Sequence, residues 1–168
     1  MSAGAAPRVL VAAIGHPDRG DDGAGPAVAR RLKPHLPADV RLIESNGDML
    51  ALIDEWVGCA AAILIDASAP GRNPGRIRCL DLVSRRLPAE FARNSTHAFG
   101  LAETVELARA LGQLPPRLVV YLVEGERFDT GAPLSPAVAA IVGKVTEKIL
   151  AELPDICRRA KMSADSDA

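Results

Sequence analysis

The sequence predicts an α/β fold: a single-domain, three-layer α/β/α sandwich with a mostly parallel, twisted sheet and an antiparallel edge strand. Three observations predict it, namely the length, the alternation of strand-like and helical segments, and one segment in which polar and apolar residues alternate. The 168 residues correspond to about one domain of ~100–200 residues. Hydrophobic residues make up 48% of the chain, as is typical of a globular protein.

Four short segments indicate the main strands of the sheet. They are Arg8–Ile14 (RVLVAAI), Val40–Glu44 (VRLIE), Ala61–Ile65 (AAILI) and Leu118–Glu124 (LVVYLVE). The nearly continuous apolar runs among them are expected of strands that helices cover on both faces. Arg76–Leu82 (RIRCLDL) instead alternates polar with apolar residues, which predicts an edge strand with one solvated face.

Helical patterns separate these strands. The expected helices are Gly23–Lys33 with Pro26 in its first turn, Asp48–Val57 with Asp48 as N-cap, Leu101–Leu111, and a last helix from Ser135-Pro136 to about Glu152. Residues 154–168 are polar. We therefore expect one domain over residues 1–153 and a flexible C-terminal tail over residues 154–168.

Composition excludes several classes of function. The 20 Lys and Arg residues nearly balance 21 Asp and Glu residues, and aromatic residues make up 3% of the chain. A nucleic-acid-binding surface is therefore not expected, because it needs excess positive charge or stacking side chains. No apolar run approaches the ~20 residues of a membrane span. The balanced charge also favours a monomer.

The cysteines and the N-terminus indicate a reducing cytoplasm. The three cysteines (Cys59, Cys79 and Cys157) are odd in number and too scattered for a disulfide framework or a CxxC metal site. The first apolar run is short and ends at Gly15, so it is interpreted as a core strand rather than a signal peptide.

A glycine-rich loop, GHPDRGDDGAG over Gly15–Gly25, follows the first strand. Such loops often bind phosphate, but Asp21 and Asp22 would repel an anion, and no Lys-Ser/Thr pair follows the glycines. The loop is better suited to a cation or a proton donor. The alternative is that one aspartate caps the helix and the other is solvated.

Asp66 and His97 are the other candidates. Asp66 directly follows an apolar strand, and the carboxyl ends of parallel strands form the ligand crevice of open α/β sheets. A carboxylate there is costly unless it is paired or bound to metal, although it could instead cap a turn. His97 precedes a helix. A single histidine in a loop is usually only a polar surface residue, and His16 and His35 are competing candidates.

One imidazole and two carboxylates form a mixed nitrogen and oxygen ligand set that suits nickel, zinc, manganese or iron. The sequence contains neither HExxH nor GxSxG, which disfavours the common zinc and serine hydrolase sites. An aspartic dyad of Asp22 and Asp66 sharing a proton remains open.

Four segments, IGHPDRGDDGAG, LIDA, STHAFGL and PLSP, occur in this order between about Arg8 and Glu152. In this the chain resembles the maturation endopeptidases of [NiFe] hydrogenases. The resemblance implies a twisted sheet flanked by helices, and a metal-binding, catalytic set that falls by position on Asp22, Asp66 and His97. His16 stands where the family usually has Asn, and Ala13 where it often has Gly.

The resemblance also implies a reaction. Such an enzyme removes a C-terminal extension from the hydrogenase large-subunit precursor after nickel insertion, and recognises nickel held by the substrate rather than a permanently bound ion. Asp21 would then hold the loop or orient Asp22. Two alternatives remain: a nickel-dependent chaperone or scaffold that does not cleave the large subunit, and an unrelated small α/β hydrolase.

Overall fold

The computed structural model describes residues 8–88 and 100–166 of the chain. The strands are β1 (Val9–Ile14), β2 (Val40–Ser45), β3 (Ala61–Ser68), β4 (Ile77–Asp81) and β5 (Arg117–Glu124). The helices are α1 (Ala24–Leu32), α2 (Met49–Trp56), α4 (Leu101–Ala110), α5 (Pro136–Ala139) and α6 (Val142–Ser166). Two short 3₁₀ turns, η1 (Gly20–Gly23) and η2 (Lys33–His35), precede and follow α1.

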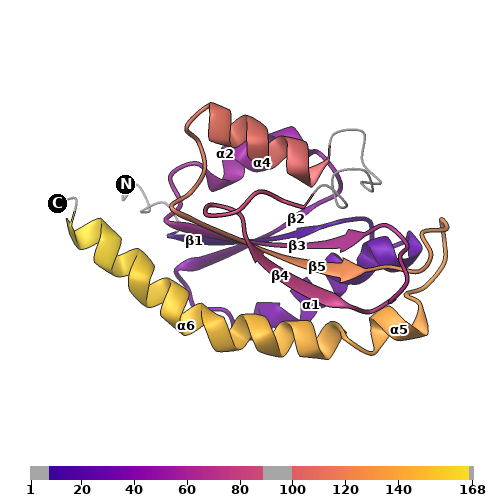
Figure 1. Cartoon of the computed structure of the whole chain (residues 1–168). Helices are drawn as coiled ribbons and strands as arrows, with labels where there is room; N and C mark the ends of the chain where they lie inside the picture. The colour runs from indigo at the N-terminus through magenta and orange to yellow at the C-terminus, as the bar shows by residue number, and fades with distance from the viewer. Residues whose placement is uncertain (1–7, 89–99, 167–168) are drawn as a thin grey trace.

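The five strands form one sheet in the order β2-β1-β3-β5-β4. β1 pairs in parallel with both β2 and β3, and β3 pairs in parallel with β5. β4 pairs antiparallel with β5 at the edge of the sheet. This topology confirms the predicted fold class, including the antiparallel edge strand. It also places the carboxyl ends of the four parallel strands at one edge of the sheet (Figure 1).

Helices cover both faces of the sheet, as Figure 1 shows. Alternate residues of β1 point to opposite faces, so Val11 packs in the core with Val28 of α1 and Ile149 of α6. Leu10 packs on the other face with Trp56 of α2, in a cluster that also contains residues of α4. The observed layers are therefore α1, α5 and α6, then the sheet, then α2 and α4.

Two predicted helix caps are confirmed. Asp48 Oδ1 accepts a hydrogen bond from Ala51 N (3.0 Å) at the start of α2, and Ser135 Oγ accepts one from Val138 N (3.4 Å) at the start of α5. The last helix differs from the prediction because it is divided: α5 ends at Ala139 and α6 begins at Val142.

The predicted tail over residues 154–168 is wrong as far as Ser166, because α6 continues to that residue. Pro154 lies inside the helix on its exposed side. Beyond it, Ile156, Cys157 and Ala160 are buried against the sheet. Together with Leu153 they form an apolar stripe with helical spacing, and its burial stabilises the helix beyond the proline.

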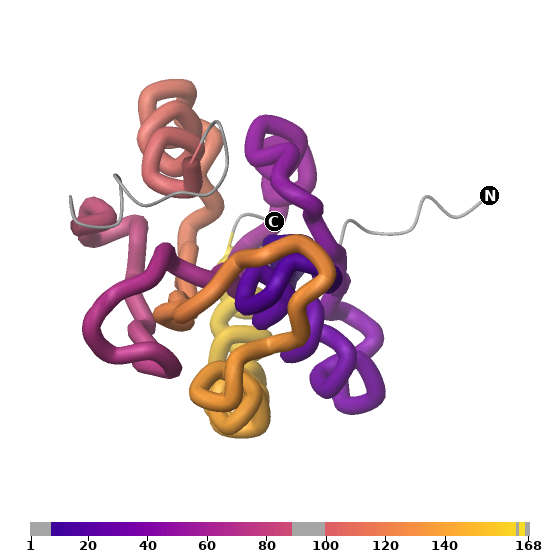
Figure 2. The backbone as a smooth tube through the Cα atoms, turned by 90° about the vertical axis from the view of Figure 1, so that its right-hand side faces the viewer, coloured from indigo at the N-terminus to yellow at the C-terminus, as the bar shows by residue number. Residues whose placement is uncertain are grey.

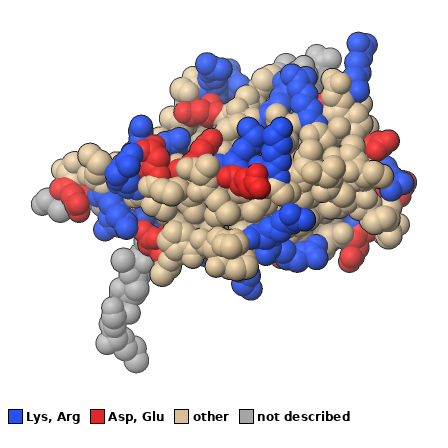
Figure 3. Space-filling view, turned by 90° about the horizontal axis from the view of Figure 1, so that it is seen from below, with Lys and Arg blue, Asp and Glu red and all other residues tan. Residues whose placement is uncertain are grey.

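The face formed by α1, α5 and α6 carries basic and acidic side chains side by side (Figure 3). Asp155, for example, lies within ion-pair distance of Arg117, Arg158 and Arg159. This mixture is consistent with the balanced composition and does not form the single-sign field that polyanion binding uses. Within residues 8–88 and 100–166, no helix has the length and apolar character needed to cross a membrane.

Candidate functional site

Three connections meet at the carboxyl edge of the sheet: the glycine loop after β1, the β3–β4 loop and the β5–α5 loop. Backbone hydrogen bonds join them to neighbouring strands, from Gly15 N to Ser45 O (2.9 Å) and from Gly125 N to Ser68 O (3.0 Å). Figure 2 views this edge directly and shows the orange β5–α5 loop lying against the indigo glycine loop.

Asp22 lies in η1 and is fully buried. Its Oδ2 accepts a hydrogen bond from the backbone N–H of His16 (2.8 Å), which closes the glycine loop on itself. Gly15 makes this closure possible: its φ is +128°, and a Cβ at this position would lie 2.0 Å from the carbonyl oxygen of Asp22. No other residue fits at Gly15 without moving Asp22.

Asp66 lies within β3, paired in register with Leu122 of β5, and is 6% exposed. The strand continues to Ser68, so Asp66 belongs to the strand rather than following it. Its Oδ1 accepts a hydrogen bond from Ala67 N (2.8 Å). Burial first, and then the negative charge of Asp22, raise the pKa of the Asp66 carboxyl well above its ordinary value, against the opposing effect of the Ala67 hydrogen bond.

Asp22 therefore lies near enough to Asp66 for its negative charge to disfavour the charge of the Asp66 carboxylate. His97 lies outside the described residues, so its place beside this pair stays a prediction. Within the described part of the chain, no group of three or more His, Cys, Asp or Glu side chains has an arrangement that could hold a metal ion.

The pair suits two kinds of chemistry. Two buried carboxylates that repel each other bind a divalent cation favourably, because the cation favours their ionised forms and offsets the repulsion. The same pair can share a proton, since the raised pKa of Asp66 favours its neutral form beside Asp22. Carboxylate oxygens are donors that divalent cations accept, but two carboxylates alone are fewer ligands than such a site normally uses.

Asp21 has a different environment from Asp22. It is fully buried, and its carboxylate accepts hydrogen bonds from Glu126 N (2.7 Å), Arg127 N (3.2 Å), Ser135 N (2.7 Å) and Ser135 Oγ (2.8 Å). The alternative in which one aspartate caps α1 and the other is solvated is therefore wrong. The N-cap of α1 is Gly23, without a side-chain capping bond.

Sequence reasoning identified Ser135 as a helix cap and missed its contact with Asp21. The signal that pointed to it was the PLSP segment, which contains Ser135. The competing histidines are on the surface: His16 is exposed and contributes its backbone N–H, and His35 is exposed in η2.

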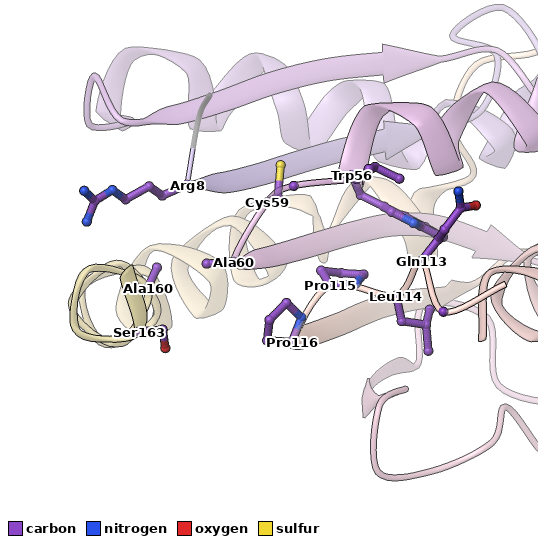
Figure 4. A pocket seen from close by; sticks show the side chains of 13 residues that line it. Arg8, Trp56, Cys59, Ala60, Gln113, Leu114, Pro115, Pro116, Ala160 and Ser163 are labelled. Carbon is purple, nitrogen blue, oxygen red and sulfur yellow. The ribbon is translucent and has the colours of Figure 1, made fainter. Parts of the chain in front are cut away.

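A pocket of about 420 Å³ lies at the opposite edge of the sheet, where the strands begin (Figure 4). Its wall includes Trp56, Cys59, Pro116 and Ala160, and the side chain of Arg8 extends away from the other labelled residues. It contains none of the predicted site residues.

Comparison with known proteins gives a consistent result. A family model described as hydrogenase maturation protease matches residues 26–152, a range that includes Asp66 and His97 and begins just after the glycine loop. The chain is 27% identical over 150 residues to the hydrogenase 2 maturation protease of Escherichia coli (strain K12), covering 87% of this chain and 90% of that protein. It is 31% identical over 151 residues to the hydrogenase expression/formation protein HupD of Rhodobacter capsulatus, covering 87% of this chain and 71% of that protein.

Solved structures show the same similarity. The fold matches that of the hydrogenase maturating endopeptidase HybD from E. coli with a TM-score of 0.76 and 26% identity, over 88% of this chain and 93% of that one. It matches the [NiFe] hydrogenase maturation protease HybD from Thermococcus kodakarensis with a TM-score of 0.66 and 28% identity, over 83% of this chain and 95% of that one.

Proposed function

The chain belongs to the hydrogenase maturation protease family and is therefore an endopeptidase, and we propose that it removes the C-terminal extension of a nickel-loaded [NiFe] hydrogenase large-subunit precursor. The observation that supports this most directly is the coupled pair of buried carboxylates, Asp22 and Asp66, at the carboxyl edge of the sheet. The names of the relatives supply the substrate class.

In this proposal the nickel ion is part of the substrate. Asp22 and Asp66, with His97, contact the nickel that the precursor already holds. The contact places the scissile peptide beside the ion, where the ion can polarise the carbonyl or activate water. A precursor without nickel lacks this anchor, so cleavage is restricted to the loaded substrate by differential binding.

A second mechanism uses the same residues without help from the metal in the bond-breaking step. The pKa of Asp66 is raised by burial and by Asp22, so the pair can hold one shared proton in the manner of an aspartic protease. Asp22 would then act as base toward water, and Asp66 as the acid. Nickel would contribute only to recognition.

We further propose that the protein acts in the cytoplasm as a monomer that meets the precursor transiently. The balanced charge of the chain and its unpaired, scattered cysteines support this assignment.

The test is a processing assay. Purified nickel-loaded precursor is incubated with the protein, and the mass of the large subunit is measured. We expect the loss of a C-terminal peptide, and no such loss from nickel-free precursor. Asp22→Asn, Asp66→Asn and His97→Ala should each reduce the rate at least about 100-fold, the lower end expected for groups acting on the reacting atoms.

Asp18→Asn is the matched control, because Asp18 is an exposed aspartate of the same loop. Undiminished cleavage by all three site variants would refute the assigned roles. A stable complex with the precursor and no change in mass would instead identify the chain as a chaperone or scaffold.

A further inference from the structure

The proposed function uses Asp22 and Asp66 but leaves Asp21 without a role. The Asp21 side chain nevertheless accepts four hydrogen bonds at the carboxyl edge of the sheet. Its Oδ2 accepts from Glu126 N, Arg127 N and Ser135 Oγ, and its Oδ1 accepts from Ser135 N. Charged acceptors form stronger hydrogen bonds than neutral ones, so this contact holds the glycine loop firmly to the β5–α5 loop.

The backbone strengthens the same contact. Gly20 N donates to Ala132 O (3.0 Å), and Asp21 N donates to Arg127 O (2.8 Å). Gly20 has a φ of +55°, and a Cβ there would lie 2.4 Å from Arg127 O. The two loops therefore touch backbone to backbone, and η1 cannot rotate without breaking several hydrogen bonds at once.

The geometry of η1 connects Asp21 to Asp22. A 3₁₀ helix has about three residues per turn, so neighbouring side chains project about 120° apart. With Asp21 directed into the β5–α5 loop, Asp22 is directed elsewhere, and its Oδ2 meets the backbone N–H of His16. Because both carboxylates belong to one short turn, the anchoring of Asp21 sets the orientation of Asp22.

We propose that Asp21 is a positioning residue, whose buried carboxylate locks η1 against the β5–α5 loop and thereby presents Asp22 toward Asp66. The inference rests on the proposed function only where it assigns Asp22 to the substrate's nickel. Asp21 itself touches neither substrate nor metal.

The decisive variant is Asp21→Asn, which has the same shape. Both carboxylate oxygens accept hydrogen bonds from backbone N–H groups. Either orientation of the asparagine amide therefore places an NH₂ group against an N–H donor. We expect kcat/KM for processing to fall about 10- to 100-fold, as for groups that orient a metal ligand, at a temperature where circular dichroism shows the variant folded.

Amide hydrogen exchange provides a readout that does not depend on activity. The His16 N–H is bonded to Asp22 and not to Asp21, so its exchange rate reports the orientation of Asp22. We expect Asp21→Asn to speed His16 exchange at least about tenfold through local opening. The control Asp18→Asn should change both readouts by no more than about twofold, since exposed substitutions have small effects.

An unchanged His16 exchange rate in folded Asp21→Asn overturns the proposal, whatever the activity, because Asp21 would then only brace the β5–α5 loop. If Asp21→Asn does not fold, Ser135→Ala replaces it, since it removes one donor to Oδ2 and keeps the Ser135 N–H bond to Oδ1. That variant should speed His16 exchange about threefold, and no change overturns the proposal. A wild-type protein that fails to cleave the precursor refutes the proposed function and leaves the exchange result to decide the role of Asp21.

Discussion

Two regions at the carboxyl edge of the sheet bury aspartates in opposite ways. In the first, Asp21 lies between the glycine loop and the β5–α5 loop, and its carboxylate accepts four hydrogen bonds. In the second, Asp66 lies on β3 near Asp22 and accepts a hydrogen bond from the N–H of Ala67. Hydrogen-bond donors surround the Asp21 carboxylate, whereas burial and the negative charge of Asp22 raise the pKa of Asp66.

The difference separates stability from function. A buried carboxylate that several donors surround stabilises the fold, because those donors would otherwise be left without acceptors. A buried carboxylate beside another carboxylate destabilises the fold, and a fold retains such a pair where it serves chemistry. The variants below test this contrast, from the largest expected effect to the smallest.

Removing the Asp21 carboxylate should have the largest effect. Asp21→Ala leaves the backbone N–H groups of Glu126, Arg127 and Ser135 without their acceptor, and the bond from Ser135 is buried. We expect the free energy of unfolding to fall by about 3–5 kcal/mol, as when one partner of a buried charged network is lost. Urea denaturation measures it, with exposed Asp18→Ala as the control. A loss below about 1 kcal/mol would remove the contrast between the two regions.

Gly20→Ala should disturb the same region through the backbone. Gly20 and Gly112 both have left-handed backbone conformations, with φ of +55° and +67°, but nothing lies within 4 Å of a Cβ at Gly112. We expect Gly20→Ala to lower the free energy of unfolding by about 2–4 kcal/mol, because conformational strain and a backbone clash add at this position. Gly112→Ala should lower the free energy of unfolding by about 1 kcal/mol, from conformational strain alone. Equal decreases in the free energy of unfolding for the two variants would show that the backbone contact between Gly20 and Arg127 adjusts at little cost.

Asp66→Asn should stabilise the metal-free protein. Because burial and Asp22 raise the folded-state pKa of Asp66 above its ordinary value of 3.8, ionisation favours the unfolded chain. The Asp66 carboxyl therefore contributes most to the free energy of unfolding below pH 3.8, and this contribution is lost as pH rises through the folded-state pKa. Asparagine does not ionise, so the variant does not lose stability as pH rises. Its side-chain oxygen can still accept the hydrogen bond from Ala67 N.

We expect the free energy of unfolding to rise at neutral pH, together with the loss of processing activity. Thermal melts of wild type and Asp66→Asn in a chelator, between pH 4 and 8, should diverge as pH rises. Curves that stay parallel over this range would contradict the opposed roles of Asp21 and Asp66.

Ser135→Ala should have the smallest effect. It removes the bond to Asp21 Oδ2 and the cap of α5, and keeps the backbone donor to Oδ1. We expect the free energy of unfolding to fall by about 1 kcal/mol. Ser163→Ala, which removes an exposed hydroxyl that donates to Arg159 O, is the matched control and should change stability by less than about 0.5 kcal/mol.

Much of the fold was predictable because its signals are local. The apolar runs at Val9–Ile14 and Ala61–Ile65 are strands because helices cover both faces. The alternation around Ile77–Asp81 marked the antiparallel edge strand. The end of α6 was missed because Pro154 and the polar residues after it outweighed the buried stripe at Leu153, Ile156 and Ala160.

The site was predictable only in part. Asp22 and Asp66 could be placed together because the carboxyl ends of parallel strands meet at one edge. The sequence predicted that Asp21 holds the loop or orients Asp22, but its contacts could not be predicted, because its donors Glu126 and Ser135 are 105 and 114 residues away in sequence. No local pattern encodes such a contact. His97 remains a prediction from the sequence.

The sequence separation of the Asp21 contacts has a consequence for how the chain matures. Contacts between distant residues form late, because the intervening chain must first be ordered. The glycine loop is synthesised early, but it cannot close until β5 and the start of α5 have left the ribosome and joined the sheet. A nascent chain without β5 therefore lacks the donors that hold Asp21, and its glycine loop is not yet anchored.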